Sequence, residues 1–340
     1  MNNAFLGAAS FLTAALVSLT SLTAADQLPV PDGKPADMSK PVQVYILMGQ
    51  SNMLGFGNTK KLTPAVAKVQ YPYLIDAAGN WTERKDVRNV RVMSSGAGKM
   101  KGFNNEWMTL KGKIGPEIGI GHHIGNVTDA PVLILKSCIG NRSLGWDILP
   151  PGSKQYQVGD YTYAGYKDSP RKWLTGTTPK RIGWYAGVQY DGDTRNAKTV
   201  LKNLATYYPG ATKYEIAGFF WWQGDRDKGS SVHAAKYEEN LINLIAALRK
   251  DFNAPNAKFV SATLGQTKKG EGGNTGKLLE GTLAIGDYAK YPAHKGNVGA
   301  VYTHPLSMGS SSSGHYGGNP ETYMNIGEGM GKAMVELIKK

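Results

Sequence analysis

Near-continuous apolar runs recur along the chain and predict the strands of a buried sheet. They cover residues 42–48, 131–137, 214–222, 257–264 and 297–303, and none shows the strict alternation of a half-exposed strand. Apolar runs without alternation are typical of a parallel sheet that is covered on both faces by helices. The pattern therefore predicts a sheet of about five parallel strands.

Helical patterns lie between these runs. Apolar residues at spacings of three and four fill residues 194–208 and 231–252, and a further helical pattern closes the chain over 321–340. Pro116 stands where a helix over 116–126 would begin. Because strands and helices alternate, we expect βαβ units in one doubly wound sheet, which is the α/β fold class.

Two regions interrupt this alternation. Residues 55–115 contain a short apolar run at 87–93 and much loop, and residues 147–193 form a long polar segment rich in Tyr, Trp, Gly and Pro. Connections of this length are usually binding surfaces or insertions. Exposed aromatic rings among polar residues suit the apolar faces of sugars, so the second region either lines a substrate site or packs as a structural insert. No linker divides residues 26–340, which we expect to be a single domain with the insert near its active site.

The first 25 residues have the pattern of a signal peptide. They are uncharged, rich in small and apolar residues, and end in a small-residue cleavage site after Ala25. We therefore expect a secreted or periplasmic protein, with a retained membrane anchor as the other interpretation. No later segment reaches the run of about 20 apolar residues that a membrane span needs, so we expect no stable membrane association.

Charge and cysteine content narrow the function classes. The formal net charge is +13, but Lys and Arg are scattered along the chain, which favours a solvated surface over a nucleic-acid interface. Cys138 is the single cysteine, so no internal disulfide can form. Its position just after an apolar strand predicts a packed side chain rather than a reactive thiol.

The first strand ends in Gly-Gln-Ser-Asn-Met, which places Ser51 at the carboxyl edge of the predicted sheet. Open α/β sheets hold their sites at this edge. A serine that begins a helix has a free backbone N–H and the helix dipole behind it, and both stabilise an oxyanion. The alternative interpretation is a serine that only caps a helix.

A serine nucleophile needs a base. Of the six histidines, His304 and His315 follow the last predicted strand and so reach the same sheet edge as Ser51. His315 lies in a glycine-rich loop that opens the final helix, and it is the favoured base. His304 is the second candidate.

Two other strand ends supply hydrogen-bond donors. Gly140 lies in the turn after residues 131–137, and Gln223 follows residues 214–222 with a side-chain amide that can donate. Asp225 and Asp227 come directly after Gln223. Successive strand ends thus present a serine, a glycine turn and a glutamine.

Five segments together resemble the SGNH hydrolases, and more closely the group of sialate O-acetylesterases and carbohydrate esterase family six, which includes acetyl xylan esterases. The segments are GQSNM (49–53), GPEIG (115–119), KSCIGNRSL (136–144), WWQGDRD (221–227) and HYGGNPETYMNIGEGMGKAM (315–334). The resemblance covers roughly residues 40–110, 115–145 and 214–340. It implies a flavodoxin-like three-layer αβα sandwich with long active-site loops. It also implies serine-dependent deacetylation of carbohydrate esters without metal or cofactor.

The resemblance also implies roles for single residues. Ser51 matches the nucleophile and His315 the base, while Ser51, Gly140 and Gln223 match the oxyanion hole. Neighbouring polar residues are expected to bind substrate, namely Gln50, Asn52 and Asn141.

The third member of the triad is open. Many members of the family carry an acid three residues before the histidine, where this chain has Ser312. Asp225 is the favoured replacement. The alternatives are a backbone carbonyl in place of a carboxylate, which would leave a Ser–His dyad, and Asp227.

The sequence therefore predicts a carbohydrate O-acetylesterase that works through an acetyl-enzyme intermediate. Acetylated polysaccharide such as xylan, or O-acetyl sialic acid, is the expected partner, and nucleic acid is not. Two alternatives stay open: an esterase of the same fold acting on aryl or lipid esters, and a non-catalytic relative that binds carbohydrate.

Overall fold

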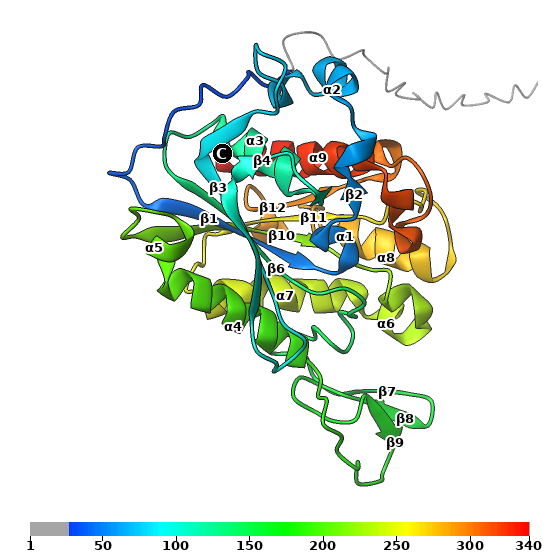
Figure 1. Cartoon of the computed structure of the whole chain (residues 1–340). Helices are drawn as coiled ribbons and strands as arrows, with labels where there is room; N and C mark the ends of the chain where they lie inside the picture. Colours follow the sequence, from blue (N-terminus) through cyan, green and yellow to red (C-terminus); the bar gives the residue numbers. More distant parts are fainter. Residues whose placement is uncertain (1–26, 340) are drawn as a thin grey trace, which may run out of the picture.

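The computed structural model describes residues 27–339 (Figure 1), so the expected signal peptide at 1–25 lies outside the described residues. Within residues 27–339, seven strands form the central sheet in the order β12-β11-β10-β1-β6-β3-β4. Their bounds are β1 (Val42–Gly49), β3 (Glu83–Met93), β4 (Lys101–Thr109), β6 (Val132–Ser137), β10 (Tyr214–Trp222), β11 (Lys258–Ala262) and β12 (Val298–Val301). All neighbours in this sheet are parallel except β3 and β4, which pair antiparallel at one edge.

All five predicted apolar runs lie in this sheet, as β1, β6, β10, β11 and β12. The estimate of about five strands is low because β3 and β4 come from the region 55–115, where charged residues hide the pattern. Arg84 and Arg88 on β3 are buried, and each guanidinium has partners. Arg84 pairs with Asp86 at 2.6 Å, and Arg88 donates to the Tyr207 carbonyl at 2.9 Å.

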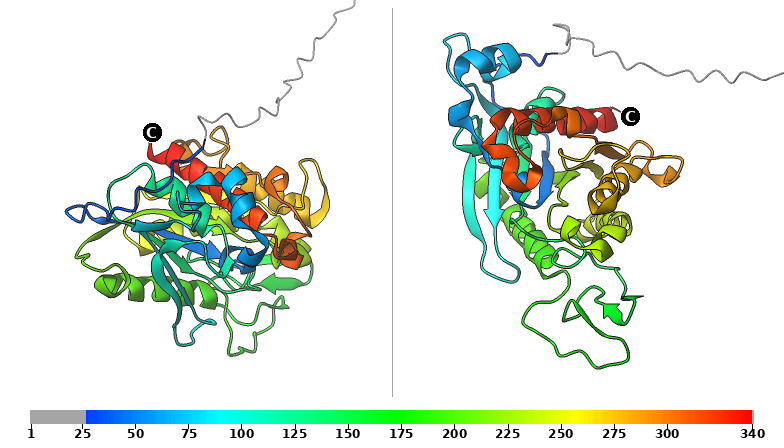
Figure 2. Two further views of the ribbon diagram at one scale, coloured as in Figure 1. Left: turned by 45° about the horizontal axis from the view of Figure 1, so that its top comes forward. Right: turned by 90° about the vertical axis from the view of Figure 1, so that its right-hand side faces the viewer.

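Apolar side chains cover both faces of the sheet, which explains the missing alternation. On β1, Val44, Ile46 and Met48 belong to one core cluster, and Tyr45 and Leu47 belong to the other. The first cluster includes side chains of α4 (Val188–Lys202), α7 (Tyr237–Asp251) and α8 (Gly273–Ala284). The second includes side chains of α3 (Glu117–Gly125) and α9 (Pro320–Ile338). Figure 2 shows these two groups of helices on opposite sides of the strands.

The helices differ from the sequence pattern at their ends. The helix expected over 194–208 begins earlier as α4, and α5 (Leu204–Tyr207) follows after Asn203. The helix expected over 231–252 is two helices, α6 (Ser231–Ala235) and α7, with Lys236 between them. Glycines within α8 lower its helix propensity and hid it from the pattern. The first half also contains α2 (Pro64–Gln70), and β2 (Gly57–Asn58) pairs with β5 (Lys113–Ile114).

The long segment 147–193 has structure of its own. It contains a small antiparallel sheet of β7 (Tyr156–Val158), β8 (Tyr161–Tyr163) and β9 (Lys172–Leu174), which lies apart from the main sheet in Figure 1. A small apolar cluster ties this segment to the main body; its members are Trp146, Leu149, Ala164 and Ala186, with Trp173 and Trp184 packed against them. The segment is therefore a packed insert, and some of its residues also line the cavity described below.

Cys138 is fully buried in the second core cluster, as the sequence predicts, and burial raises the pKa of its thiol. In the part of the chain that the structure describes, no helix combines the length and the apolar character needed to cross a bilayer.

Candidate functional site

Ser51 is the first residue of α1 (Ser51–Leu54) and lies where β1 ends at the carboxyl edge of the sheet. The chain turns there through Gly49, whose φ is +145°, and an added Cβ would lie 2.2 Å from the Trp222 carbonyl oxygen. Only glycine fits such a conformation beside a neighbouring backbone. Among residues 27–339, the Ser51 N–H has no hydrogen-bond acceptor. Because α1 is a single turn of four residues, its free N–H groups rather than a long helix dipole supply the positive potential.

Gly140 lies directly beside Ser51. A Cβ added to Gly140 would be 3.5 Å from the Cβ of Ser51. The loop after β6 therefore brings the Gly140 backbone next to the first residue of α1. The next residue, Asn141, is exposed and has a φ of +56°.

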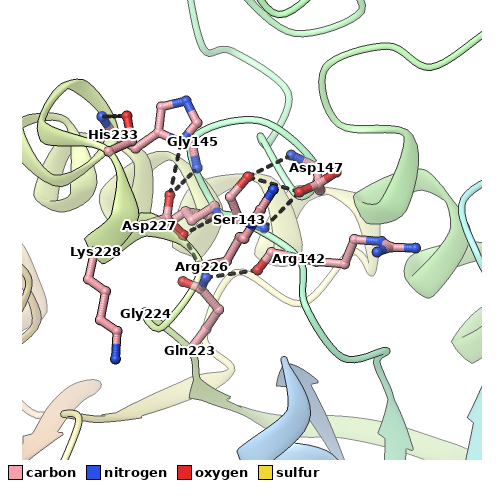
Figure 3. Close-up of polar contacts among 12 residues, drawn as sticks. Arg142, Ser143, Gly145, Asp147, Gln223, Gly224, Arg226, Asp227, Lys228 and His233 are labelled. Carbon is pink, nitrogen blue, oxygen red and sulfur yellow. Dashed lines mark hydrogen bonds and ion pairs between the residues drawn. The ribbon is translucent and has the colours of Figure 1, made fainter. Parts of the chain in front are cut away.

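Gln223 is buried, and the NH2 group of its amide is engaged, whereas its Oε1 has no hydrogen-bond partner among residues 27–339. The Nε2 atom lies within hydrogen-bond distance of the Arg142 carbonyl at 2.9 Å and Asp227 Oδ2 at 2.6 Å (Figure 3), and of a third acceptor, Gln50 Oε1, at 3.0 Å. A primary amide has two N–H bonds, so donation to an oxyanion requires one of these acceptors to be exchanged. In this geometry Gln223 joins the loops that follow β1, β6 and β10.

Gln50 also holds the loop that follows β10. Its side chain is 3% exposed, and its Oε1 accepts from Gln223 Nε2 and from the backbone N–H groups of Gly224 (3.4 Å) and Arg226 (3.2 Å). Gln50 thus fixes the β10 loop rather than facing solvent.

Asn52 is 1% exposed and also bonds within the protein. Its Nδ2 donates to Asp225 Oδ2 at 3.2 Å and to the Ser312 carbonyl at 3.0 Å, and its Oδ1 accepts from the Tyr323 hydroxyl at 3.0 Å. Asn141 is therefore the one residue of the expected substrate-binding set whose side chain is placed to meet a ligand.

His315 lies in a short helical segment, η7 (Ser312–Gly318), that packs against α1. Its φ of +52° and that of Tyr316, also +52°, are left-handed, a conformation that non-glycine residues adopt at a cost and that often marks functional sites. Tyr316 anchors the turn, since it is 1% exposed and its hydroxyl accepts from the Gly265 N–H at 3.1 Å. The imidazole stacks on Phe56 with ring centroids 3.9 Å apart.

The charges around His315 are unequal in their effect. Burial lowers the pKa of the imidazole, the Asp225 carboxylate raises it, and the Lys113 ammonium lowers it. Within residues 27–339, no hydrogen bond joins the ring to Ser51 or to Asp225, so Asp225 acts on it through space. The second candidate base, His304, has its Nδ1 bonded to the Gly265 carbonyl at 2.7 Å.

The two aspartates after Gln223 have different surroundings. Asp225 accepts hydrogen bonds from Ser312 Oγ at 2.6 Å and Lys228 Nζ at 2.7 Å, and its side chain is 8% exposed. Ser312 occupies the position of the acid that is missing before the histidine, so it holds a carboxylate from another loop at that place.

Asp227 is fully buried beneath the turn after β6. It accepts from the N–H groups of Leu144 and Gly145, each at 2.8 Å, and from Gln223 Nε2. Burial raises the pKa of Asp227 to about 6, although the hydrogen bonds from these three donors lower it. Its partners make Asp227 an anchor of the turn, whereas Asp225 is the aspartate that faces His315.

A buried ion pair supports α1 from below. Lys136 Nζ lies 2.6 Å from Glu117 Oε2 and donates to the Leu54 carbonyl, the last of α1, at 2.8 Å. Glu117 also accepts from the Gly115 N–H at 3.0 Å. The sequence analysis did not single out this pair, although a lysine within an apolar strand is a recognisable signal of a buried charge with a partner.

We expect Lys136→Met to lower the free energy of unfolding by about 3–5 kcal/mol, because it leaves the Glu117 carboxylate buried without its partner. Urea unfolding measures this change. The double variant Lys136→Met/Glu117→Gln is expected to recover part of the loss, and Lys101→Met, at an exposed position of β4, serves as the control. A single variant as stable as the wild type would contradict the role of the pair.

A cavity of about 700 Å³ opens beside these loops. The residues that line it come from the turn after β6, the segment after β10 and the insert. In the described residues 27–339, no three His, Cys, Asp or Glu side chains are grouped so that they could hold a metal ion.

Part of the chain matches a known family model. Residues 174–336 match the family model described as SASA, carbohydrate esterase, sialic acid-specific acetylesterase. None of the curated proteins matches the chain.

Two solved structures, from Arabidopsis thaliana and Xanthomonas citri, share the fold of this chain. A protein from Arabidopsis thaliana has 17% sequence identity and a TM-score of 0.50, over 87% of this chain and 98% of that one. A carbohydrate acetylesterase from Xanthomonas citri has 15% identity and a TM-score of 0.52, over 86% of this chain and 55% of that one. NanS has 14% identity and a TM-score of 0.46, over 88% of this chain and 99% of that one.

Proposed function

Because the chain is an esterase related to the sialic acid-specific acetylesterases among the carbohydrate esterases, we propose that it removes acetyl groups from carbohydrate hydroxyls by a serine-dependent reaction. One observation carries the proposal: the free N–H of Ser51 and the turn at Gly140 lie side by side at the sheet edge, against the segment that holds His315. This arrangement supplies a nucleophile, an oxyanion site and a base from three separate loops.

In the first step, the Ser51 hydroxyl attacks the acetyl carbonyl while His315 takes its proton. The tetrahedral oxyanion accepts hydrogen bonds from the Ser51 and Gly140 N–H groups. The C–O bond to the sugar then breaks, and His315 returns the proton to the sugar oxygen. In the second step, water attacks the acetyl-enzyme with His315 again as base, and acetate leaves.

Gln223 is the third donor in this proposal. Its amide reaches the oxyanion once the Arg142 carbonyl gives up its hydrogen bond. While the site is empty, the same amide holds the three loops together.

Asp225 is the proposed third member of the triad. Its negative charge stabilises the imidazolium that forms on His315, and Ser312, Asn52 and Lys228 hold its carboxylate in place. The proposal includes the finer fold assignment, a flavodoxin-like three-layer sandwich in one domain over 26–340. It also includes export through the segment 1–25.

Acetate release from acetylated xylan and from O-acetyl sialic acid tests the proposed function. A series of p-nitrophenyl esters of increasing acyl length separates it from a lipid esterase, because a carbohydrate deacetylase should turn over the acetyl ester fastest. If the folded wild-type protein releases no acetate from any of these substrates, the proposal is contradicted and a carbohydrate-binding relative is favoured.

The pH profile tests the base. His315 acts when neutral, so activity falls as the pH drops through its pKa. Because the Lys113 ammonium lowers that pKa, Lys113→Gln is expected to raise it and to move the acid limb of kcat/KM to higher pH. Lys111→Gln, at an exposed neighbouring position, is the matched control. An acid limb that does not move in Lys113→Gln would remove His315 as the titrating base.

A further inference from the structure

Two residues that line the cavity of about 700 Å³ directly follow residues of the proposed catalytic site in the sequence. Asn141 follows Gly140, and Arg226 follows Asp225. The Arg226 N–H donates to Gln50 Oε1 at 3.2 Å, so this wall is fixed to the residue before Ser51. A ligand bound at Ser51 would therefore extend into the cavity.

The cavity wall carries an excess of positive charge. Its cationic side chains are Arg142, Arg171, Lys172 and Arg226. The carboxylate in the wall, Asp147, is occupied by the Ser143 N–H at 2.8 Å and the Ser143 hydroxyl at 2.9 Å.

Two of these cations lack partners. Arg171 and Arg226 are exposed, and in residues 27–339 neither guanidinium has a hydrogen bond or an ion pair. Both line the same cavity as His233. Arginines from two different segments, the insert and the segment after β10, therefore contribute to one cavity wall. Their charges, after burial, also lower the pKa of the His233 imidazole, to about 4.

The other two cations are held elsewhere. The Arg142 guanidinium extends away from Gln223 (Figure 3) and donates to Ser95 Oγ at 2.9 Å. The Lys172 ammonium lies 3.9 Å from the centre of the Tyr161 ring. Their charge still adds to the potential of the cavity, but they are not free to hold a ligand.

Aromatic surface completes the wall. Trp146 and Trp184 both line the cavity, and the Arg142 guanidinium lies 5.1 Å from the centre of the Trp184 ring. Flat aromatic faces next to charged donors combine an apolar surface for a ring with specific polar contacts, which is how pockets for small ligands are usually built.

We propose that this cavity is a subsite for an acidic sugar unit, whose carboxylate binds Arg171 and Arg226. A guanidinium forms two parallel hydrogen bonds with a carboxylate, which favours this anion over a neutral hydroxyl. The inference rests on the proposed function and names its substrate class: an acetylated glycan that carries a carboxylate in, or next to, the acetylated unit.

Two matched substrate pairs test the subsite. One is acetylated galacturonan with its carboxylates free or methyl-esterified, and the other is O-acetyl sialic acid and its carboxyl methyl ester. We expect kcat/KM for the free acid to exceed that for the ester about tenfold or more in at least one pair. High salt should reduce the ratio, because it screens exposed charges.

Variants assign the effect to the two arginines. The double variant Arg171→Gln/Arg226→Gln is expected to bring the acid-to-ester ratio close to one. Arg181→Gln should keep the wild-type ratio, because that exposed arginine of the same insert does not line the cavity. A wild-type ratio near one in both pairs, or a ratio that survives the double variant, overturns the subsite. Faster turnover of an acetylated, sulfated glycan than of either free acid overturns the carboxylate assignment.

Two readouts separate this inference from the proposed function. Hydrolysis of p-nitrophenyl acetate by the wild type reports the esterase alone, so its loss would count against the proposed function. Quenching of tryptophan fluorescence by galacturonate or N-acetylneuraminate, compared with their methyl esters, reports binding in the Ser51→Ala variant, without turnover. Equal binding of acid and ester there counts against the subsite.

Discussion

Ser51→Ala is expected to lower acetate release by about 10³-fold or more, since it removes the group that forms the acetyl-enzyme. The half-buried side chain makes no hydrogen bond within residues 27–339, so its loss should leave the free energy of unfolding almost unchanged. Initial rates on p-nitrophenyl acetate and a urea unfolding curve measure the two quantities.

The matched control for this variant is Ser313→Ala. Ser313 is exposed on the loop that carries His315 and bonds Ser311. Its removal should leave turnover within about twofold of the wild type, as expected for a surface change away from the reacting atoms. If Ser51→Ala keeps wild-type turnover, Ser51 is a turn residue and the nucleophile lies elsewhere.

Substitution of Asp225 should lower activity, whereas substitution of Asp227 should lower stability. Asp225→Asn is expected to lower kcat by about 10²–10⁴-fold, because the imidazolium on His315 loses the charge that stabilises it. It should also lower the pKa of His315 and move the acid limb of activity to lower pH, because Asp225 raises that pKa. A purely structural role would not move the limb.

Asp227→Asn should act on stability instead. The new amide group turns N–H bonds toward backbone N–H donors of Leu144 and Gly145 that are buried with it. Leaving buried donors without acceptors costs about 1–3 kcal/mol for each group, so we expect a loss of about 2–5 kcal/mol. Urea unfolding of both variants, with a pH profile of each, measures the contrast. Unchanged stability in Asp227→Asn together with a shifted acid limb would exchange the roles of the two residues.

The parts of the fold that sequence reasoning found are those that burial dictates. The five apolar runs predict strands because side chains such as Val44 and Tyr45 pack on opposite faces of one sheet. The same logic missed β3, because Arg84 and Arg88 are buried there and bond distant residues as well, Arg84 the Asn126 side chain and Arg88 the Tyr207 carbonyl. Buried charge is visible only once those partners are known.

The site, like the fold, was predictable from the sequence only in part. A position at a strand end predicts that Ser51 and Gly140 meet, because parallel strands share one carboxyl edge. Hydrogen-bond partners do not follow from position. The contact of the Gln223 amide nitrogen with the Arg142 carbonyl and the contact of Ser312 with Asp225 join segments 81 and 87 residues apart. These contacts decide which polar side chain faces a substrate and which holds a loop.

The most direct test of serine-dependent deacetylation is to trap the acetyl-enzyme. The wild-type protein is mixed with p-nitrophenyl acetate, quenched in acid within milliseconds, digested and analysed by mass spectrometry. We predict an added acetyl group on the peptide that contains Ser51, and its absence in Ser51→Ala. Rapid turnover with no acetyl group on Ser51, or with one on another residue, would contradict the account.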